Sequence, residues 1–379
     1  MHSSENGNAM TLPGRYYTDA EIFRREMDAF FRGMWFCAGR EGQIESAGDY
    51  FLCEAAGESL IVTRDTSGAI QAFYNVCRHR GTRICREVTG EFAGRIQCPY
   101  HGWTYALDGS LTGAPFMEEG FRRDDFPLHC VSSAVWDGHI FLNMSPEAPP
   151  LSEQLGELPE NFAPWQMRDL RMHNRIEYDV SANWKLIISN YNECLHCPVL
   201  HPLLCEVSDP MSGDNEAPQP GYIGGSMEFR RGAQTMSMDG TRKRDYLPGL
   251  SDEQRKRVFY YAIYPNLLLS LHPDYMMVHR LWPQAVDRTK IACEWHFHPA
   301  ELAKRDFVAE DVIEFWDTTN REDWDISEQS QLGISSRAYQ PGPYSTREGL
   351  LSAFDKRVLE LEKAHKAHTG GDELNRGSS

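Results

Sequence analysis

The chain has 379 residues, of which 41% are hydrophobic, 25% charged and 11% aromatic, and its formal net charge is −17. This length allows about two globular domains, while the negative charge argues against binding to nucleic acid or to an anionic membrane surface. The polar N-terminus lacks a secretory signal, and no stretch of about 18 apolar residues could span a membrane. We therefore expect a soluble, cytoplasmic protein whose ten cysteines are free thiols or metal ligands.

Between Gly48 and Met144 the sequence consists of short segments typical of β-strands, separated by turns. The strand-like segments are DYFLCEA, SLIVTRD, IQAFYNV, GRIQCPY and WTYALDGSL. Within the last of them, Asp108 and Gly109 form a pair typical of a tight hairpin. This region predicts a small antiparallel β domain, and the proline-rich residues 146–150 mark its end.

The chain that follows combines helical and strand-like patterns. Asn183–Cys194 has the pattern of a helix. Three longer segments have the pattern of strands: Tyr260–Leu271, Tyr275–Trp282 and Lys290–His298. Turns at residues 272–274 and 283–289 would join these strands.

A C-terminal helix is predicted after residue 345. Ser345 and Glu348 have the spacing of a capping box. Apolar residues then recur at helical intervals, at Leu350, Leu351, Phe354, Val358 and Leu361. The second domain is therefore expected to mix helices and strands, and we expect the polar tail at residues 371–379 to be disordered.

Two pairs of metal-binding residues lie at predicted hairpin loops of the first domain. Cys77 and His79 form one pair, and Cys98 and His101 form the other. In a Rieske centre two histidines replace two cysteines on one iron of a [2Fe–2S] cluster, which requires a Cys/His pair from each loop. A structural Cys₂His₂ zinc site uses the same donors, but usually with a wider spacing than the single residue between Cys77 and His79. The four residues therefore predict a Rieske-type [2Fe–2S] cluster.

A second group of metal-binding residues lies in and after the predicted helix. Glu193, His196 and His201 supply a carboxylate and two imidazoles. Asn190, Glu193 and His196 would share one helix face, and we expect Pro198 to end the helix, so that His201 turns back towards His196. Two histidines and one carboxylate on one side of an iron leave positions open for dioxygen, as in non-haem Fe(II) oxygenases.

A helical di-iron protein is a different interpretation of the same region. Glu193 with His196, and Glu362 with His365, have the Glu-x-x-His spacing of such bundles. A bundle of that kind needs four long helices, and the strands predicted between residues 259 and 298 exclude it. We therefore assign Glu362 and His365 to a solvated helix face.

The segments NVCRHRGTRI and QCPYHGWTY resemble the Rieske domain of the large, alpha subunits of ring-hydroxylating oxygenases. The run NYNECLHCP is more similar to the carnitine and glycine betaine monooxygenases of this family than to members that attack aromatic rings. The resemblance implies an α+β fold: a small antiparallel β Rieske domain at residues 46–150, and a helix-grip-like catalytic domain at residues 151–370 in which an antiparallel sheet is combined with helices. Residues 1–45 would pack with the catalytic domain.

The resemblance also assigns roles to particular residues. It gives the position of Glu193 to an electron bridge between the subunits of a head-to-tail homotrimer, whose contacts close as a ring. The resemblance places the third iron ligand, an aspartate, far downstream. When Glu328 and the glutamines that follow it are aligned with the corresponding family segment, the ligand position falls on Asp323, with Asp325 as the alternative. In this interpretation Asp323 completes the iron site of the two histidines.

Together, the two metal sites imply an oxygenase that receives its electrons from another protein. A cluster stores one electron, and a mononuclear iron needs electrons one at a time in order to activate O2. No G-x-G-x-x-G segment follows a predicted strand, so we expect NAD(P)H and flavin to bind a separate reductase, alone or together with a ferredoxin. A Rieske electron-transfer protein is the non-enzymatic alternative, but it would need only about the first third of the chain.

The similarity to carnitine and glycine betaine monooxygenases favours a quaternary ammonium substrate. An aromatic cage binds such a cation, and the predicted strands offer candidate rings at Tyr260, Tyr261, Tyr264, Tyr275 and Trp282. Aromatic residues on strands are mostly part of the core, which is the competing interpretation of these five. Hydroxylation of an N-methyl group would release formaldehyde. The alternative substrate is an aromatic acid or ether, for ring hydroxylation or dioxygenation or for O-demethylation.

Overall fold

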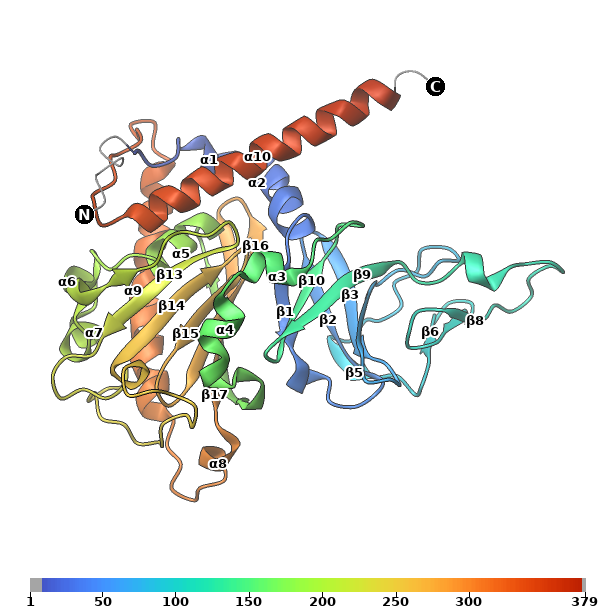
Figure 1. The fold of residues 1–379 in the computed structure, drawn as a ribbon. Helices are drawn as coiled ribbons and strands as arrows, with labels where there is room; N and C mark the ends of the chain where they lie inside the picture. The colour runs from blue at the N-terminus through green and yellow to red at the C-terminus, as the bar shows by residue number, and fades with distance from the viewer. Residues whose placement is uncertain (1–8, 377–379) are drawn as a thin grey trace. The chain divides into compact units, whose positions relative to one another are not determined.

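The computed structural model describes residues 9–376, which fall into two compact units (Figure 1). One unit runs from Phe31 to Leu151. The other combines the N-terminal segment up to Phe30 with the chain from Ser152 onwards. The predicted domain limits at residues 45 and 150 stay predictions. No helix among residues 9–376 is long and apolar enough to cross a membrane.

The smaller unit is built from two antiparallel sheets. A seven-stranded sheet has the order β1-β10-β9-β4-β3-β2-β5, and a three-stranded sheet has the order β6-β7-β8. The strands are β1 (Phe36–Arg40), β2 (Asp49–Ala55), β3 (Glu58–Arg64), β4 (Ile70–Tyr74), β5 (Thr89–Glu91), β6 (Ile96–Gln97), β7 (Thr104–Tyr105), β8 (Leu111–Gly113), β9 (Cys130–Trp136) and β10 (His139–Asn143). The predicted small antiparallel β domain is confirmed.

The tight turn predicted at Asp108 and Gly109 lies between β7 and β8. Gly109 has a φ of 86°, a conformation that favours glycine, and an added Cβ would collide with the ring of Phe73. The carboxylate of Asp108 accepts hydrogen bonds from the backbone N–H of Ser110 at 2.9 Å and from its hydroxyl at 2.7 Å. The turn therefore fixes β7, which carries Tyr105 next to the first metal-binding loop.

The larger unit contains a second seven-stranded sheet, in the order β11-β17-β16-β15-β14-β13-β12. Its strands are β11 (Arg171–Val180), β12 (Asp214–Asn215), β13 (Tyr222–Glu228), β14 (Arg257–Ile263), β15 (Leu267–Leu271), β16 (Met276–Ala285) and β17 (Arg288–Phe297). All neighbouring strands are antiparallel. The α+β fold with an antiparallel catalytic sheet is confirmed.

Two predicted strand limits are wrong. The segment Tyr260–Leu271 forms two strands, because the turn at residues 264–266 separates β14 from β15, and Pro265 in this turn has no N–H for a strand ladder. Pro283 lies inside β16, so the turn expected from residue 283 begins only after Ala285.

The helices of the larger unit are α1 (Arg15–Thr18), α2 (Ala20–Glu26), α4 (Leu158–Phe162), α5 (Trp184–Tyr191), α6 (Cys197–Leu200), α7 (Pro202–Val207), α8 (Pro299–Leu302), α9 (Glu310–Ile334) and α10 (Gly349–Arg376); α3 (Leu151–Leu155) begins at its boundary. Helix α5 packs against α9, and these two helices also contact the sheet through β16 and β11 (Figure 1). Helix α10 packs against α2 and β13. The predicted disordered tail falls partly on α10, and residues 377–379 lie outside the described residues.

The helix predicted at Asn183–Cys194 is shorter in the structure. Asn183 is the N-cap, and its side chain accepts a hydrogen bond from the backbone N–H of Lys185 at 3.1 Å. Helix α5 ends at Tyr191, and residues 192–196 are irregular. Pro198 does not end α5, as we expected, but occupies the first turn of α6, where its missing N–H costs no hydrogen bond.

Helix α5 begins at a buried ion pair with α2. Nζ of Lys185 donates to Oε2 of Glu26 at 2.7 Å, and these side chains are 0% and 1% exposed. The indole Nε1 of Trp184 donates to the same carboxylate oxygen at 3.1 Å. Because a buried charge is stable only when it is paired, this contact fixes the start of the helix that leads into the Glu193–His201 segment.

The assignment of Glu362 to a solvated helix face is wrong. Glu362 lies on α10 and is 4% exposed. Its carboxylate accepts hydrogen bonds from the hydroxyl of Tyr16 at 2.9 Å and from Nη2 of Arg25 at 3.0 Å. This residue therefore ties α10 to α1 and α2, while the side chain of His365 lies outside the described residues.

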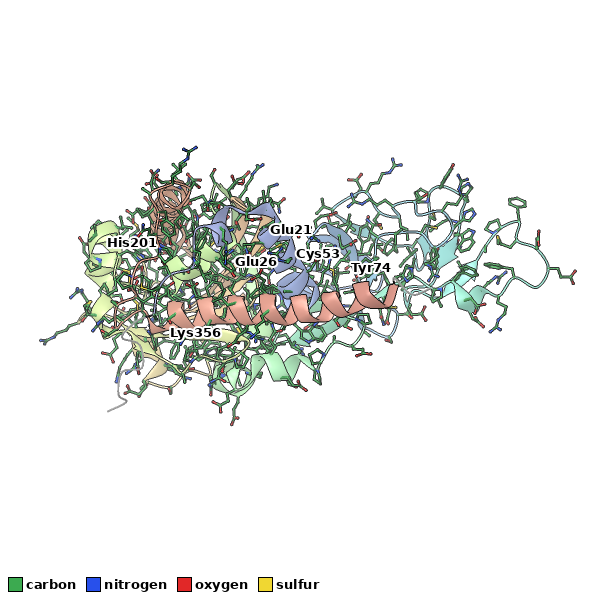
Figure 2. All side chains as sticks on the ribbon, turned by 90° about the horizontal axis from the view of Figure 1, so that it is seen from above. Glu21, Glu26, Cys53, Tyr74, His201 and Lys356 are labelled. Carbon is green, nitrogen blue, oxygen red and sulfur yellow. A yellow bond between two sulfur atoms is a disulfide. The ribbon has the colours of Figure 1, made fainter. Side chains whose placement is uncertain are left out.

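We expect Glu26→Ala to lower the free energy of unfolding by about 3–5 kcal/mol, because it leaves the ammonium group of Lys185 buried without its partner. Glu21→Ala is the matched control, since Glu21 lies on the same helix (Figure 2), its ion pair with Arg24 is exposed and exposed pairs contribute little. Chemical denaturation followed by circular dichroism measures both variants. Equal losses would contradict the anchoring role of the Glu26–Lys185 pair.

Candidate functional site

The two loops of the first predicted metal site have the same backbone hydrogen bonds. The N–H of Cys77 donates to the carbonyl of Thr82 at 2.9 Å, and the N–H of Gly81 donates to the carbonyl of Cys77 at 3.0 Å. In the second loop Cys98 bonds to Trp103 and Gly102 in the same way, at 2.8 and 3.2 Å. Gly81 and Gly102 have φ values of 73° and 71°, which favour glycine. Each Cys/His pair is therefore presented on one tight turn.

The side chains of these loops separate buried sulfur from accessible imidazole. Cys77 and Cys98 are buried free cysteines, whereas His79 is exposed and His101 half-buried. The two imidazole rings lie 4.6 Å apart between centroids, and Trp103 stacks on His79 at 5.0 Å. Two thiols and two imidazoles from two turns fit the donor set of a Rieske [2Fe–2S] cluster.

Tyr105 is a further residue of this site that the sequence did not single out. Its hydroxyl lies 3.4 Å from Sγ of Cys77 and accepts a hydrogen bond from the N–H of Arg78 at 3.1 Å. Burial, and then its contact with Cys77, raise the pKa of Tyr105, so the phenol keeps its proton and can donate it. Hydrogen bonds to the sulfurs of an Fe–S cluster tune its reduction potential.

The second predicted site brings together residues from two distant segments. His196 and His201 flank the short helix α6, and Asp323 lies on α9. Oδ1 of Asp323 is 2.9 Å from Nε2 of His201 and 3.4 Å from Nε2 of His196. Asp325, the alternative carboxylate, is exposed. The three convergent donors fit the two-histidine, one-carboxylate set that binds Fe(II) in oxygenases.

Both imidazoles of this site are also held through their other ring nitrogen. Oε1 of Glu193 lies 2.5 Å from Nδ1 of His196, and Oε2 of Glu322 lies 2.7 Å from Nδ1 of His201. A carboxylate in this position fixes the tautomer and orientation of a metal-binding histidine. Glu322 was not assigned a role from the sequence, although it directly precedes Asp323.

The charges of the site favour a cation between these side chains. Burial lowers the pKa of His196, but hydrogen bonds with Asp323 and Glu193 outweigh burial and raise it to about 9. Burial and Asp323 act on His201 in the same two directions, and its pKa is raised. Burial raises the pKa of Asp323, yet its hydrogen bonds with the histidines lower it overall. A metal dication would displace the imidazole protons on binding.

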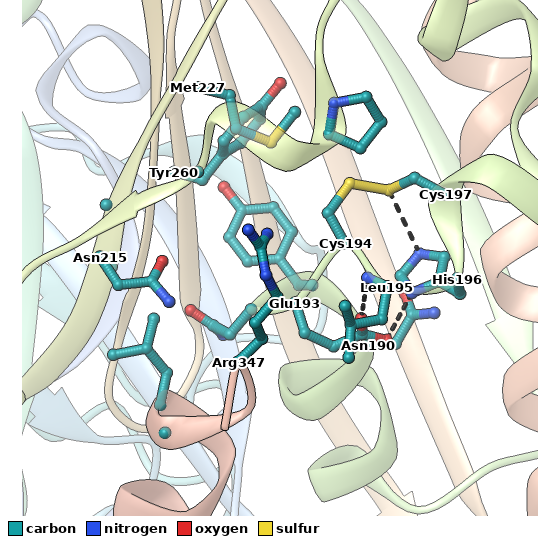
Figure 3. Close-up of a pocket in the computed structure, with 18 of the residues that line it drawn as sticks. Asn190, Glu193, Cys194, Leu195, His196, Cys197, Asn215, Met227, Tyr260 and Arg347 are labelled. Carbon is teal, nitrogen blue, oxygen red and sulfur yellow. Dashed lines mark hydrogen bonds and ion pairs between the residues drawn. A yellow bond between two sulfur atoms is a disulfide. The ribbon is translucent and has the colours of Figure 1, made fainter. Parts of the chain in front are cut away.

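A cavity of about 680 Å³ opens next to these residues (Figure 3). Glu193, His196, His201 and Asp323 form part of its lining. Aromatic rings line it as well, at Tyr191, Tyr260 and Trp316. Cationic side chains come from the start of α10 and the turn before it, at Arg347 and Lys356.

Four of the five rings proposed from the sequence lie elsewhere in the larger unit. None of Tyr261, Tyr264, Tyr275 and Trp282 is among the described residues that line the cavity, whereas Tyr260 is. Adjacent residues of a strand point to opposite faces, so Tyr261 packs against Phe162, with ring centroids 4.8 Å apart.

The other three rings also lie outside the cavity lining, although the hydroxyl of Tyr275 accepts a hydrogen bond at 2.7 Å from Nε1 of Trp316, which does line it. Tyr264 packs against Phe354. The hydroxyl of Tyr275 donates to the carbonyl of Met236, and Trp282 is half-exposed at the far part of β16. Trp316, which no sequence pattern indicated, lines the cavity because it precedes Asp323 by two turns of α9.

The expectation that all cysteines are free thiols or metal ligands is wrong for two of them. Cys194 and Cys197 form a disulfide, with their Cα atoms 5.0 Å apart, while the other eight cysteines are free. The irregular backbone after α5 brings the pair within the separation that a disulfide requires. Both cysteines line the cavity.

Two family descriptions match the sequence. Residues 34–132 match the Rieske [2Fe-2S] domain, and residues 167–363 match the catalytic domain of the ring hydroxylating alpha subunit. Each matched segment contains one of the two sites described above.

Individual proteins are similar over most of the chain. A glycine betaine monooxygenase oxygenase subunit of Chromohalobacter salexigens is 30% identical over 88% of this chain and 82% of its own length. A carnitine monooxygenase oxygenase subunit of Acinetobacter pittii is 28% identical over 88% and 87%. A crystal structure of the quaternary ammonium Rieske monooxygenase CntA superposes with a TM-score of 0.81, at 25% identity, over 94% of this chain and 97% of that one.

We expect Asp323→Ala to lose the metal of the second site and Asp325→Ala to keep it, because only Asp323 contacts both imidazoles. The wild-type protein should contain about three irons per chain, two of them in the cluster. Iron analysis together with the visible absorbance of the cluster separates the two sites. Loss of the third iron in Asp325→Ala alone would contradict the assignment.

Proposed function

Because the chain belongs to the family of ring-hydroxylating oxygenase alpha subunits and carries their Rieske domain, we propose that it oxidises an N-methyl group of a small quaternary ammonium compound. The chain is the oxygenase component of a multicomponent enzyme that takes its electrons from a separate reductase. Its cofactors are a [2Fe–2S] cluster and a mononuclear iron. The observation that supports the proposed substrate is a cavity that combines the second metal site with aromatic rings and a cationic side chain.

We assign the cluster to Cys77, His79, Cys98 and His101, and Fe(II) to His196, His201 and Asp323. When bound, the cluster supplies single electrons and the iron supplies a site for O2. The protein residues fix the geometry around them. Glu193 and Glu322 hold the two imidazoles so that both Nε2 atoms face Asp323.

The aromatic rings of the cavity suit an ammonium group. Tyr260 lies edge-on to both Tyr191 and Trp316, with centroid distances of 5.9 and 6.2 Å. A cation over the face of such rings gains about 0.5–2 kcal/mol each, most where water is excluded. The hydroxyl of Tyr260 is buried and makes no hydrogen bond within residues 9–376.

Arg347 supports a substrate that also carries a carboxylate. Its side chain extends towards the cavity (Figure 3), where Nη1 lies 3.8 Å from the sulfur of Met211, a long contact with a weak acceptor. A carboxylate bound to a guanidinium forms charge-assisted hydrogen bonds. A betaine, with an ammonium group at one end and a carboxylate at the other, satisfies both parts of the cavity.

The proposal includes an assembly and a location. The enzyme would form a head-to-tail homotrimer in the cytoplasm, with Glu193 linking the cluster of one subunit to the iron of the next. The reductase, or a ferredoxin with its reductase, would bind NAD(P)H and flavin. Glu193 is suited to a bridge because it is half-buried at the cavity while one of its oxygens already contacts His196.

We expect the chemically reduced enzyme to convert glycine betaine to dimethylglycine in one turnover after O2 is added. O2 is the oxidant, and it takes up one electron from the cluster, one from Fe(II) and two protons. One oxygen atom is released in formaldehyde, formed from the N-methyl group, and the other is released as water. The yield should approach about one formaldehyde per chain, measured with a colorimetric assay and mass spectrometry of the amine. A hydroxylated aromatic acid as the only product of a substrate screen would reject the proposal.

Arg347→Met tests which substrate group the cavity recognises. It should raise the KM for glycine betaine at least about tenfold, because one charge-assisted contact is lost. The KM for choline, which has a hydroxymethyl group in place of the carboxylate, should stay nearly unchanged. Arg321→Met is the control, because this exposed arginine pairs with Asp317 outside the cavity lining. Equal effects on the two substrates would remove Arg347 from substrate recognition.

In iron-loaded enzyme, we expect Glu193→Gln to slow oxidation of the cluster during a single turnover at least about tenfold, because the amide cannot replace the bridging carboxylate. Glu322→Gln is the matched control, since it alters the same kind of contact on His201. It should weaken iron affinity by about 10–100-fold without slowing electron transfer in iron-loaded enzyme. Stopped-flow absorbance measures cluster oxidation, and identical kinetics in both variants would contradict the bridge.

A further inference from the structure

The disulfide lies within the segment that carries the two histidines of the second site. Cys194 and Cys197 enclose Leu195 and His196. Sγ of Cys197 is 3.9 Å from Nε2 of His196, the nitrogen that faces Asp323. One potential ligand atom each from His196, Cys197 and His201 lie within 4.8 Å of one another. The sulfur held in the disulfide is therefore already close to the proposed metal position (Figure 3).

We propose that the Cys194–Cys197 disulfide is a redox-controlled switch of the metal site, which adds Cys197 as a thiolate ligand when it is reduced. This inference rests on the metal site proposed above. In the disulfide, the sulfur of Cys197 carries no charge and forms no metal–thiolate bond. Reduction leaves a thiol that shares the same side of the site as His196 and His201.

The chemistry of the switch is thiol–disulfide exchange with a dithiol reductant. A thiolate of the reductant attacks Sγ of Cys194, which is half-exposed at the cavity, and the Cys194–Cys197 bond breaks with Cys197 as the leaving thiolate. The second thiol of the reductant then displaces Cys194. In total the protein disulfide gains two electrons and two protons, and the dithiol is oxidised to a disulfide. When Cys197 binds a metal, its proton passes to solvent.

The position of each sulfur fits this order of events. Cys194 is half-exposed, whereas Cys197 is 3% exposed, so a reductant reaches the first sulfur and releases the second inside the protein. The backbone of residues 192–196, which carries Cys194, is irregular, and Cys197 is the first residue of α6. In the described chain no other disulfide is present.

A thiolate would change what the site binds. Thiolate is a soft donor that favours Zn²⁺ and occupies a position that the two-histidine, one-carboxylate set leaves open for O2. The reduced form would therefore hold metal more firmly and react with O2 more slowly. The oxidised form keeps only nitrogen and oxygen donors, which is the set expected of a working oxygenase.

Zinc K-edge X-ray absorption of the full-length protein tests the switch directly. The mononuclear site is loaded with Zn²⁺ in samples that retain two cluster irons per chain, so that zinc does not replace the cluster. One half is reduced with a water-soluble phosphine, which is oxidised to the phosphine oxide with an oxygen atom from water while the disulfide gains two electrons and two protons, and is then desalted anaerobically. We expect only nitrogen and oxygen neighbours at about 2.0–2.1 Å in the oxidised protein, and one additional sulfur at about 2.3 Å after reduction.

Two single variants provide the controls. Cys194→Ser leaves Cys197 free in every sample, and it should show the sulfur neighbour without reductant. Cys197→Ser should show none in either state. Alkylation with N-ethylmaleimide and mass spectrometry of denatured, zinc-free protein checks that reduction exposes two new thiols in the wild-type chain.

The outcomes separate this inference from the proposed function. Zinc with only nitrogen and oxygen neighbours in both reduced wild-type protein and Cys194→Ser would overturn the switch and leave the metal site intact. Unchanged zinc binding in His201→Ala would show that the metal site itself is wrong. A sulfur neighbour in Cys197→Ser would assign the ligand to another cysteine and would also overturn the proposal.

Discussion

One carboxylate oxygen of Asp323 lies 2.9 Å from Nε2 of His201 and 3.4 Å from Nε2 of His196, and these side chains come from segments more than one hundred residues apart. An ionised carboxylate between packed helices is costly unless positive charge or hydrogen-bond donors face it. The fold must therefore hold the loop after α5 against the middle of α9. It does so by packing α5 on α9 and by anchoring the start of α5 at the buried Glu26–Lys185 pair.

Helix α9 controls His201 from both sides of its ring. Glu322 and Asp323 are consecutive residues, and they contact Nδ1 and Nε2 of the same imidazole. His201 is 1% exposed, so this ring has little freedom to adopt another orientation. His196 is held differently, because its second carboxylate, Glu193, belongs to its own loop. A change in that loop would therefore move His196 while His201 stays in place.

The sequence alone groups candidate ligands where they are close together in the chain. Cys77 and His79, and likewise Cys98 and His101, are separated by one or two residues, so the turn alone brings them together. Asp323 is predicted only from the alignment of its segment with the family that the sequence resembles, because no sequence pattern identified α9 as a helix. Once that helix is known, Trp316, Thr319 and Asp323 follow at helical spacing along one face, and the contribution of Trp316 to the cavity becomes evident.

The errors concern features that local patterns do not determine. Tyr260 and Tyr261 are adjacent and chemically alike, and only the packing of the sheet decides which of them faces the cavity. The limits of α5 were misjudged because Pro198 is compatible both with the end of one helix and with the first turn of the next. The disulfide could not be assigned because the sequence gives the spacing of Cys194 and Cys197 but not the irregular backbone that joins them.

Both metal sites have two cysteines and two histidines within reach, yet they suit different chemistry. In the Rieske loops each turn carries one cysteine, so both thiols remain free for a cluster. In the second site the cysteines share one short segment and bond to each other, which removes both sulfurs from the donor set. His196, His201 and Asp323 are then left as nitrogen and oxygen donors, the donor types of a two-histidine, one-carboxylate Fe(II) site. The pairing of Cys194 with Cys197, rather than the choice of residues alone, therefore leaves this group of side chains with nitrogen and oxygen donors only.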